Sequence, residues 1–249
     1  MTGAAADLLT LPAAVAVGSA AVVAALVGGV TGGGVTAILL PILVLYVGIQ
    51  EAVPIVTIAL IAASVSRVAV YRRDLDLPVV GWFCLGSVPA TVAGTLLFTR
   101  AAPGFLTRLF GVVLIGAVLW RRLQPRPPAD LARPWFAPLG AAFGLLSGVS
   151  TAMASMPAPF FLAYGLRKEG YVGTMGLSVF VGQLVKLAVL GRASFLTGPV
   201  VVSGLMLAPF VIAGTVLGKV ILVRVSERVF VALLEIFMVG SGLLFIVRG

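Results

Sequence analysis

Two glycine-rich stretches carry the residue types best suited to chemistry in this chain. The first is GGVTGGGVTAILLP, from Gly28 to Pro41, and the second runs from Gly144 to Pro157. Glycine ends a helix at little cost and lets other groups approach the backbone. An apolar segment follows each stretch, so each places the free N–H groups and positive dipole end of a helix N-terminus beside hydroxyl groups. Such a site suits a small anion.

We therefore predict a substrate-binding site at these two helix breaks. Its expected ligands are backbone N–H groups and hydroxyls of Thr31, Gly32, Gly33, Gly34 and Thr36 in the first stretch, and of Ser147, Gly148, Ser150 and Thr151 in the second. The alternative is that Gly28-x-x-x-Gly32 and Gly144-x-x-x-Gly148 are small-residue contacts between packed helices. The sequence leaves both interpretations open.

Charged residues inside apolar segments are a second group of candidates. Arg67 and Lys186 occupy matching places, in Ser64-x-x-Arg67 and Gln183-x-x-Lys186. A cation within the membrane costs roughly 3 kcal/mol or more, so we predict that both cations, with Gln183, help to bind the anion. The alternative is that they snorkel to the interface, since both lie near a segment end. Glu235 is a candidate for pairing with a cation or for carrying a coupling proton.

Composition indicates a membrane protein. The chain is 61% hydrophobic and 10% charged, against roughly 25% charged for a soluble domain. Long uncharged runs are typical of transmembrane helices. The net charge of +9 comes from short loops, which membrane topology explains better than nucleic-acid binding. With no His and one Cys, Cys84, we expect no metal site, no disulfide and no cofactor.

The chain contains two diverged copies of one unit. Gly28-x-x-Thr31-Gly32 and Pro41 are matched 116 residues later by Gly144-x-x-Ser147-Gly148 and Pro157. Pro89-x-x-x-Ala93-Gly94-Thr95 is matched 120 residues later by Pro209-x-x-x-Ala213-Gly214-Thr215, and Arg108 and Phe110 by Arg228 and Phe230. We predict a first repeat over residues 1–123, a cytoplasmic linker over 124–133 and a second repeat over 134–249.

Ten apolar segments are expected, five in each repeat: Leu11–Val27, Val35–Val47, Ala52–Tyr71, Leu77–Phe98, Leu109–Trp120, Trp135–Ser147, Ala152–Tyr164, Tyr171–Leu190, Phe195–Val223 and Val229–Val247. Polar turns are expected at Gly48–Glu51 and Arg100–Arg108. Segments of about 13–17 residues reach only ~20–25 Å, less than the ~30 Å hydrocarbon core. The glycine-rich turns should therefore lie within the membrane.

The loop charges set the topology. With five crossings per repeat, ten basic residues fall on one side and four on the other; with four crossings the division is eight to six. Cytoplasmic loops carry the excess of Lys and Arg, so five crossings are favoured, with the N-terminus outside. An odd number of crossings makes the repeats inverted, as in many secondary transporters. The predicted fold class is thus an all-α integral membrane protein with two inverted-topology repeats.

The order Gly28…Gly32-Gly33-Gly34…Pro41…Gly48, its weaker repeat around Gly148–Pro157 and the Pro-x-x-x-Ala-Gly-Thr echoes resemble the sulfite exporter TauE/SafE family. The resemblance covers essentially the whole chain. It implies a multi-pass transporter of the bacterial inner membrane that moves sulfur oxyanions or small organic anions such as sulfonates, usually outward. The chain departs from the family pattern at Val149-Ser150-Thr151, which replaces a glycine cluster, so the two repeats need not bind substrate alike.

These observations together predict a secondary transporter of small anions, working by alternating access around a site near the membrane midplane. An anion channel and a transporter of small carboxylates are the alternatives. A membrane enzyme is disfavoured because the apolar segments hold no nucleophile–base pair, and a structural subunit is disfavoured by the internal duplication. The anion, the coupling ion and the oligomeric state stay open.

Overall fold

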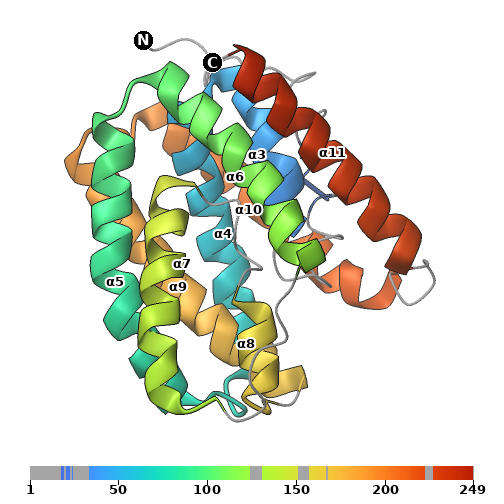
Figure 1. Ribbon diagram of the computed structural model, residues 1–249. Coiled ribbons are helices and arrows are strands. Elements are labelled where there is room, and N and C mark those ends of the chain that lie inside the picture. Colours follow the sequence, from blue (N-terminus) through green and yellow to red (C-terminus); the bar gives the residue numbers. More distant parts are fainter. Residues whose placement is uncertain are drawn as a thin grey trace.

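The computed structural model describes residues 18–19, 21–22, 24, 34–123, 131–150, 157–166, 168–221 and 227–248, and every regular element within them is a helix (Figure 1). The elements are α3 (Gly34–Val47), α4 (Ile49–Tyr71), α5 (Leu77–Arg100), α6 (Pro103–Leu123), the 3-10 helix η1 (Arg133–Trp135), α7 (Phe136–Val149), α8 (Ala158–Ala163), α9 (Lys168–Arg192), α10 (Gly198–Ile221) and α11 (Glu227–Arg248). The all-helical fold class is confirmed.

Two of the predicted turns are wrong. The turn at Gly48–Glu51 is the single residue Gly48, because α4 begins at Ile49. The turn at Arg100–Arg108 is only two residues long, because α6 begins at Pro103, six residues before the predicted start. Pro103 suggested a turn in the sequence, because proline favours turns. Proline is also favoured in the first position of a helix, where no backbone N–H is needed, and Pro103 occupies that position in α6.

Two glycines join the second and third helices of each half. Gly48 lies between α3 and α4 with φ 76°, and Gly165 follows α8 with φ 94°. Side chains rarely tolerate this left-handed backbone region, whereas glycine adopts it freely. The two positions are 117 residues apart in the sequence, close to the other offsets of the predicted duplication.

Helix lengths agree with a membrane location. Within the described residues, four helices are long and apolar enough to span a bilayer: Ile49–Ala69, Leu77–Arg100, Pro103–Trp120 and Gly170–Arg192. The apolar stretches Ile38–Val47, Gly198–Gly214 and Met238–Val247 are shorter. Helices α3 and α7 have 14 residues each, about 21 Å at 1.5 Å per residue, and so end within the ~30 Å core.

Helices from the two halves pack in antiparallel pairs. Phe110 of α6 contacts Phe245 of α11 with ring centroids 5.5 Å apart, while Arg122, further along α6, contacts Glu235, earlier on α11. Figure 1 shows α6 and α11 side by side over most of their length. Helices α4 and α9 pack in the same way, because Arg67 lies beside Gly176 and Tyr71 beside Gly173.

Helices α5 and α7 are in close backbone contact. Gly140, Gly144 and Gly148 lie one turn apart on α7, and a Cβ atom at any of them would meet the backbone of α5. At Gly148 that atom would be 2.7 Å from the carbonyl oxygen of Thr91, closer than real Cβ atoms approach. Small residues allow such close contact between membrane helices. The structure thus supports the packing interpretation of Gly144-x-x-x-Gly148.

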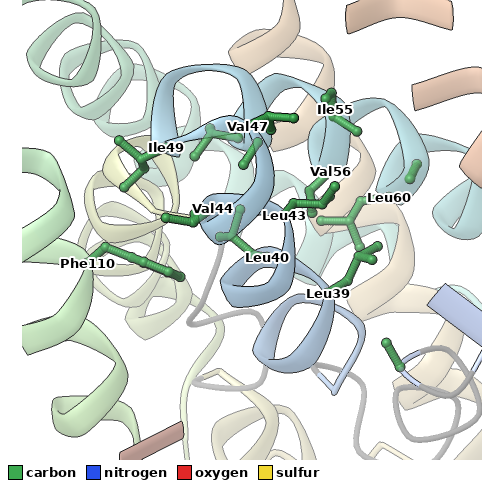
Figure 2. Close-up of a cluster of buried hydrophobic side chains, with 14 of the residues drawn as sticks. Leu39, Leu40, Leu43, Val44, Val47, Ile49, Ile55, Val56, Leu60 and Phe110 are labelled. Carbon is green, nitrogen blue, oxygen red and sulfur yellow. The ribbon is translucent and has the colours of Figure 1, made fainter. Parts of the chain in front are cut away.

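The largest buried cluster surrounds α3. Leu39, Leu40 and Leu43 are fully buried against α4, and Phe110 of α6 closes one side, as Figure 2 shows. A second cluster joins Phe83, Phe136 and Phe161 between α5, η1–α7 and α8. A helix that is apolar on most sides belongs in an interior or in a bilayer. The charge-free sequence of α3 is explained by this central position.

Candidate functional site

Lys186 is the charged group at the centre of the candidate site. Its side chain is fully buried on α9, and its Nζ donates a 2.8 Å hydrogen bond to the carbonyl oxygen of Ser147. Ser147 lies in the last turn of α7, which ends at Val149. The last four carbonyl groups of a helix have no partner within it and carry its negative dipole end. Lys186 therefore caps α7 at the predicted helix break.

The surroundings of Lys186 leave positive charge uncompensated. The ring of Phe98 is 6.0 Å from Nζ and supplies a cation–π contact. In the described part of the chain no carboxylate lies within ion-pair distance of Lys186. An ammonium group has three donors, and Ser147 accepts from one. Since a buried charge is costly without partners, this position is suited to an anionic ligand. Lys186 does not snorkel to the interface.

Two unpaired polar groups lie on the α4–α9 helix pair. Gln183, one turn before Lys186, is 2% exposed, and its Oε1 has no hydrogen-bond partner among the described residues. Ser64 is fully buried on α4, and its Oγ also lacks a partner within that part of the chain. By contrast, the hydroxyls of Thr57 and Ser178 each donate to the carbonyl one turn back at 2.8 Å. Such unpaired buried groups are few in proteins and call for an explanation.

Ser64 was not among the predicted site residues. The signal for it was present in the sequence, because Ser64-x-x-Arg67 matches Gln183-x-x-Lys186 at an offset of 119 residues. A serine is common in apolar helices, so Ser64 is a weaker signal in the sequence than Gln183 or the charged member of each pair. The structure shows that both polar members are buried and unpaired.

Arg67 lies apart from Lys186. It is half-buried on α4, and its Nε donates to the carbonyl of Ala63, one turn back, at 3.4 Å. It packs beside Gly176, ten residues before Lys186 on α9, which corresponds to about 15 Å along the helix. The structure does not bring the two predicted cations together.

The remaining predicted residues divide between the two helix breaks. Ser147, Gly148 and Ser150 are buried at the end of α7, near Lys186. Gly148 faces α5, so its missing side chain serves packing there. At the first break, α3 begins at Gly34, and Thr36 is fully buried within it. The other predicted residues, Thr31, Gly32, Gly33 and Thr151, lie outside the described part of the chain.

Glu235 forms an ion pair. Its Oε2 accepts hydrogen bonds from Nη2 and Nε of Arg122, at 2.8 and 3.0 Å. The Glu235 side chain is 11% exposed and that of Arg122 is 67% exposed. Pairing with a cation, one of the two roles predicted for Glu235, is therefore confirmed. The pair joins α6 to α11 near the end of α6.

The fold and site define a class. Apolar helices enclose a buried ammonium and unpaired amide and hydroxyl groups, and no cluster of three or more metal-ligating side chains occurs among the described residues. Polar groups inside a membrane domain usually mark a substrate or ion pathway. The protein is a multi-pass helical membrane protein with an internal polar site.

The family assignment agrees with this class. The profile of the sulfite exporter TauE/SafE family matches residues 17–245, and the chain belongs to this family. Membership implies a membrane transporter of sulfite-type anions, and the resemblance noted in the sequence is confirmed. Comparisons with curated proteins and with solved structures found no match.

Proposed function

We propose that this protein is a secondary carrier that exports small anions, sulfite or a sulfonate, across the bacterial inner membrane, and that Lys186 supplies the positive charge of its binding site. The observation that carries the proposal is the fully buried Lys186 ammonium, bound to the Ser147 carbonyl at the end of α7 without a carboxylate partner among the described residues. An anion would compensate this charge.

The helix packing supports an inverted repeat. The sequence offsets make α4 equivalent to α9, α5 to α10 and α6 to α11. Helix α5 packs on α9 as α10 packs on α4, while α4–α9 and α6–α11 are antiparallel pairs of equivalents. A two-fold axis in the membrane plane relates two halves in this way, and transporters of this kind bind substrate at the repeat interface.

In our proposal the carrier works by alternating access. The anion accepts from the donors of Lys186 that the Ser147 carbonyl leaves free, so binding changes the charge balance at the end of α7. A ligand shifts a conformational equilibrium only through a difference in affinity between two states. In our proposal the Lys186–Ser147 bond provides that difference in affinity. The two repeats exchange conformations, and this exchange opens the site first to one side of the membrane and then to the other.

Counterflow in liposomes tests the proposal. Vesicles preloaded with unlabelled sulfite and containing the purified protein should transiently accumulate labelled sulfite against its gradient. Vesicles with the Lys186→Met variant should not, while those with Arg192→Gln, which removes an exposed charge at the end of the same helix, should behave as wild type. Uptake that only equilibrates would indicate a channel, and no protein-dependent uptake would contradict the proposal.

A further inference from the structure

Ser64 and Gln183 lie close to the centre of the α4–α9 pair. Arg67 lies beside Gly176 and Tyr71 beside Gly173, so residue numbers rise along one helix as they fall along the other. The facing positions that are also 119 residues apart, and thus equivalent in the two repeats, are about Ala62 and Val181. These two positions mark the centre of the helix pair. Each unpaired residue lies two positions beyond this centre. The two groups therefore flank the level at which the equivalent helices cross.

The proposed two-fold symmetry puts both groups on one side of the helix pair. A two-fold rotation that exchanges two antiparallel helices has its axis perpendicular to the plane that contains both helices. Such a rotation keeps each side chain on its own side of that plane. Equivalent side chains of the two helices therefore face the same side. Residues three apart on a helix share a face, which places Gln183 on the side of Lys186. That side is where α7 ends, because Lys186 binds Ser147.

The chemistry of Lys186 and Gln183 is complementary to one kind of ligand. Lys186 offers N–H donors and a positive charge. The Gln183 amide offers N–H donors and also one acceptor, and its buried Oε1 has no partner among the described residues. An anion oxygen satisfies the donors of both side chains but cannot satisfy this acceptor. A buried acceptor left unpaired is unfavourable, so the best ligand also carries a hydrogen-bond donor.

We infer that Gln183 is a specificity-determining residue that selects small sulfur oxyanions carrying their own N–H or O–H group over anions of the same shape without one. The inference rests on the proposed function and extends it to the substrate class. Hydrogensulfite, in its O–H form, and amino-substituted sulfonates meet the requirement, whereas alkylsulfonates do not. A site that hydrogen-bonds a substrate group discriminates strongly against analogues that lack this group.

Sulfamate and methanesulfonate are a matched pair of probes. Both are tetrahedral monoanions at neutral pH, and they differ in having an amino group or a methyl group on the sulfonate. The measurement is the dissociation constant of each for the purified wild-type protein, Gln183→Met, Ser178→Ala and Lys186→Met. Ser178→Ala is the control, because the Ser178 hydroxyl is buried on the same helix but already donates to the Thr174 carbonyl.

The wild-type protein and Ser178→Ala should bind sulfamate about tenfold more tightly than methanesulfonate, and Gln183→Met should bind the two equally. Removal of an unpaired buried amide should leave the melting temperature of the ligand-free variant unchanged or higher. A purely structural role for Gln183 predicts instead a lower melting temperature with the preference intact. If Gln183→Met does not purify, Gln183→Leu serves the same comparison.

Two results separate this inference from the proposed function. Equal binding of both probes by wild type, or a preference that persists without Gln183, would overturn the inference while the anion site stands. Binding of both probes by Lys186→Met at wild-type strength would overturn the proposed site itself. No binding of either probe to wild type would overturn both.

Discussion

Lys186 and Glu235 are two buried charged residues with opposite arrangements. Glu235 has a cationic partner, Arg122, at 2.8 Å. Lys186 has a backbone carbonyl and an aromatic ring, and no carboxylate in the described part of the chain. A buried charge that is paired within the protein serves the fold, whereas one that lacks a counter-charge is available to a ligand. We therefore assign anion binding to Lys186 and a contact between α6 and α11 to Glu235.

The Arg122–Glu235 pair should show an asymmetric response to substitution. Arg122→Gln leaves a largely buried carboxylate unpaired, whereas Glu235→Gln leaves an exposed guanidinium that water can solvate. Losing the pair should cost roughly 1 kcal/mol in Glu235→Gln and more in Arg122→Gln. Thermal unfolding of both variants and of the double variant measures this. A larger loss in Glu235→Gln would contradict this reading of the pair.

The same variants test a coupling role for Glu235. If Glu235 is only a structural partner, Glu235→Gln should keep the proton dependence of anion transport, measured as uptake with and without an imposed pH gradient. Loss of that dependence in Glu235→Gln, with retention in Arg122→Gln, would assign the coupling proton to this carboxylate.

At the scale of helices, the close contact of α5 with α7 holds the candidate site in place. Gly140, Gly144 and Gly148 allow the backbone of α7 to lie on α5, and Ser147 between them offers its carbonyl to α9. The end of α7 is thus fixed by packing on one side and by Lys186 on another. Pre-positioned groups of this kind reduce the cost of binding a ligand.

Substitution of Gly144 by Ala should destabilise the protein, because the added Cβ would overlap the backbone of Ser87. Overpacking of this kind costs about 1–3 kcal/mol or more. Gly81→Ala, on α5 with no atom near the added Cβ, is the control and should be neutral or stabilising by up to ~1 kcal/mol. Melting temperatures compare them. A Gly144→Ala variant as stable as Gly81→Ala would show that the helices are not in close contact.

The sequence predicted most helices, because uncharged runs bounded by glycine, proline or arginine define them. Segments Val35–Val47, Ala52–Tyr71 and Leu77–Phe98 agree with α3, α4 and α5 to within three residues at either end. Pro103 was misassigned because proline favours both turns and helix starts. Lys186 and Gln183 stood out as polar residues in an apolar run. The Ser147 carbonyl could not be predicted as a partner, since it depends on how α7 packs against α9, 39 residues away in sequence.

At the scale of the whole molecule, two contacts place several loops at one end. The Arg133 Nε donates to the Tyr164 hydroxyl at 2.8 Å, and the backbone N–H of Asp76 donates to Thr174 Oγ1 at 3.0 Å. The loop after α4, the start of the second half and the α8–α9 turn therefore lie together. Their basic residues include Arg72, Arg73 and Arg133. This grouping supports the five-crossing topology, with these loops in the cytoplasm.

Labelling of single cysteines tests this topology. In a Cys84→Ala background, cysteines at Arg126 and Arg167 should react only from the cytoplasm, and a cysteine at Arg100, at the C-terminal end of α5, only from outside. An impermeant maleimide applied to intact cells and to inverted vesicles makes the comparison. Reaction of the Arg126 and Arg167 positions from opposite sides would contradict the five-crossing arrangement.

Equilibrium binding of labelled sulfite to the purified protein tests the central claim most directly. Wild type and Arg192→Gln should bind with the same dissociation constant, and Lys186→Met should bind at least about tenfold more weakly, since a hydrogen bond to a charged group is worth about 1.5–3 kcal/mol. The ligand-free Lys186→Met variant should melt no lower than wild type, because it no longer buries an uncompensated charge. Binding of sulfite by a folded Lys186→Met variant with wild-type affinity would contradict the assignment of the anion site to Lys186.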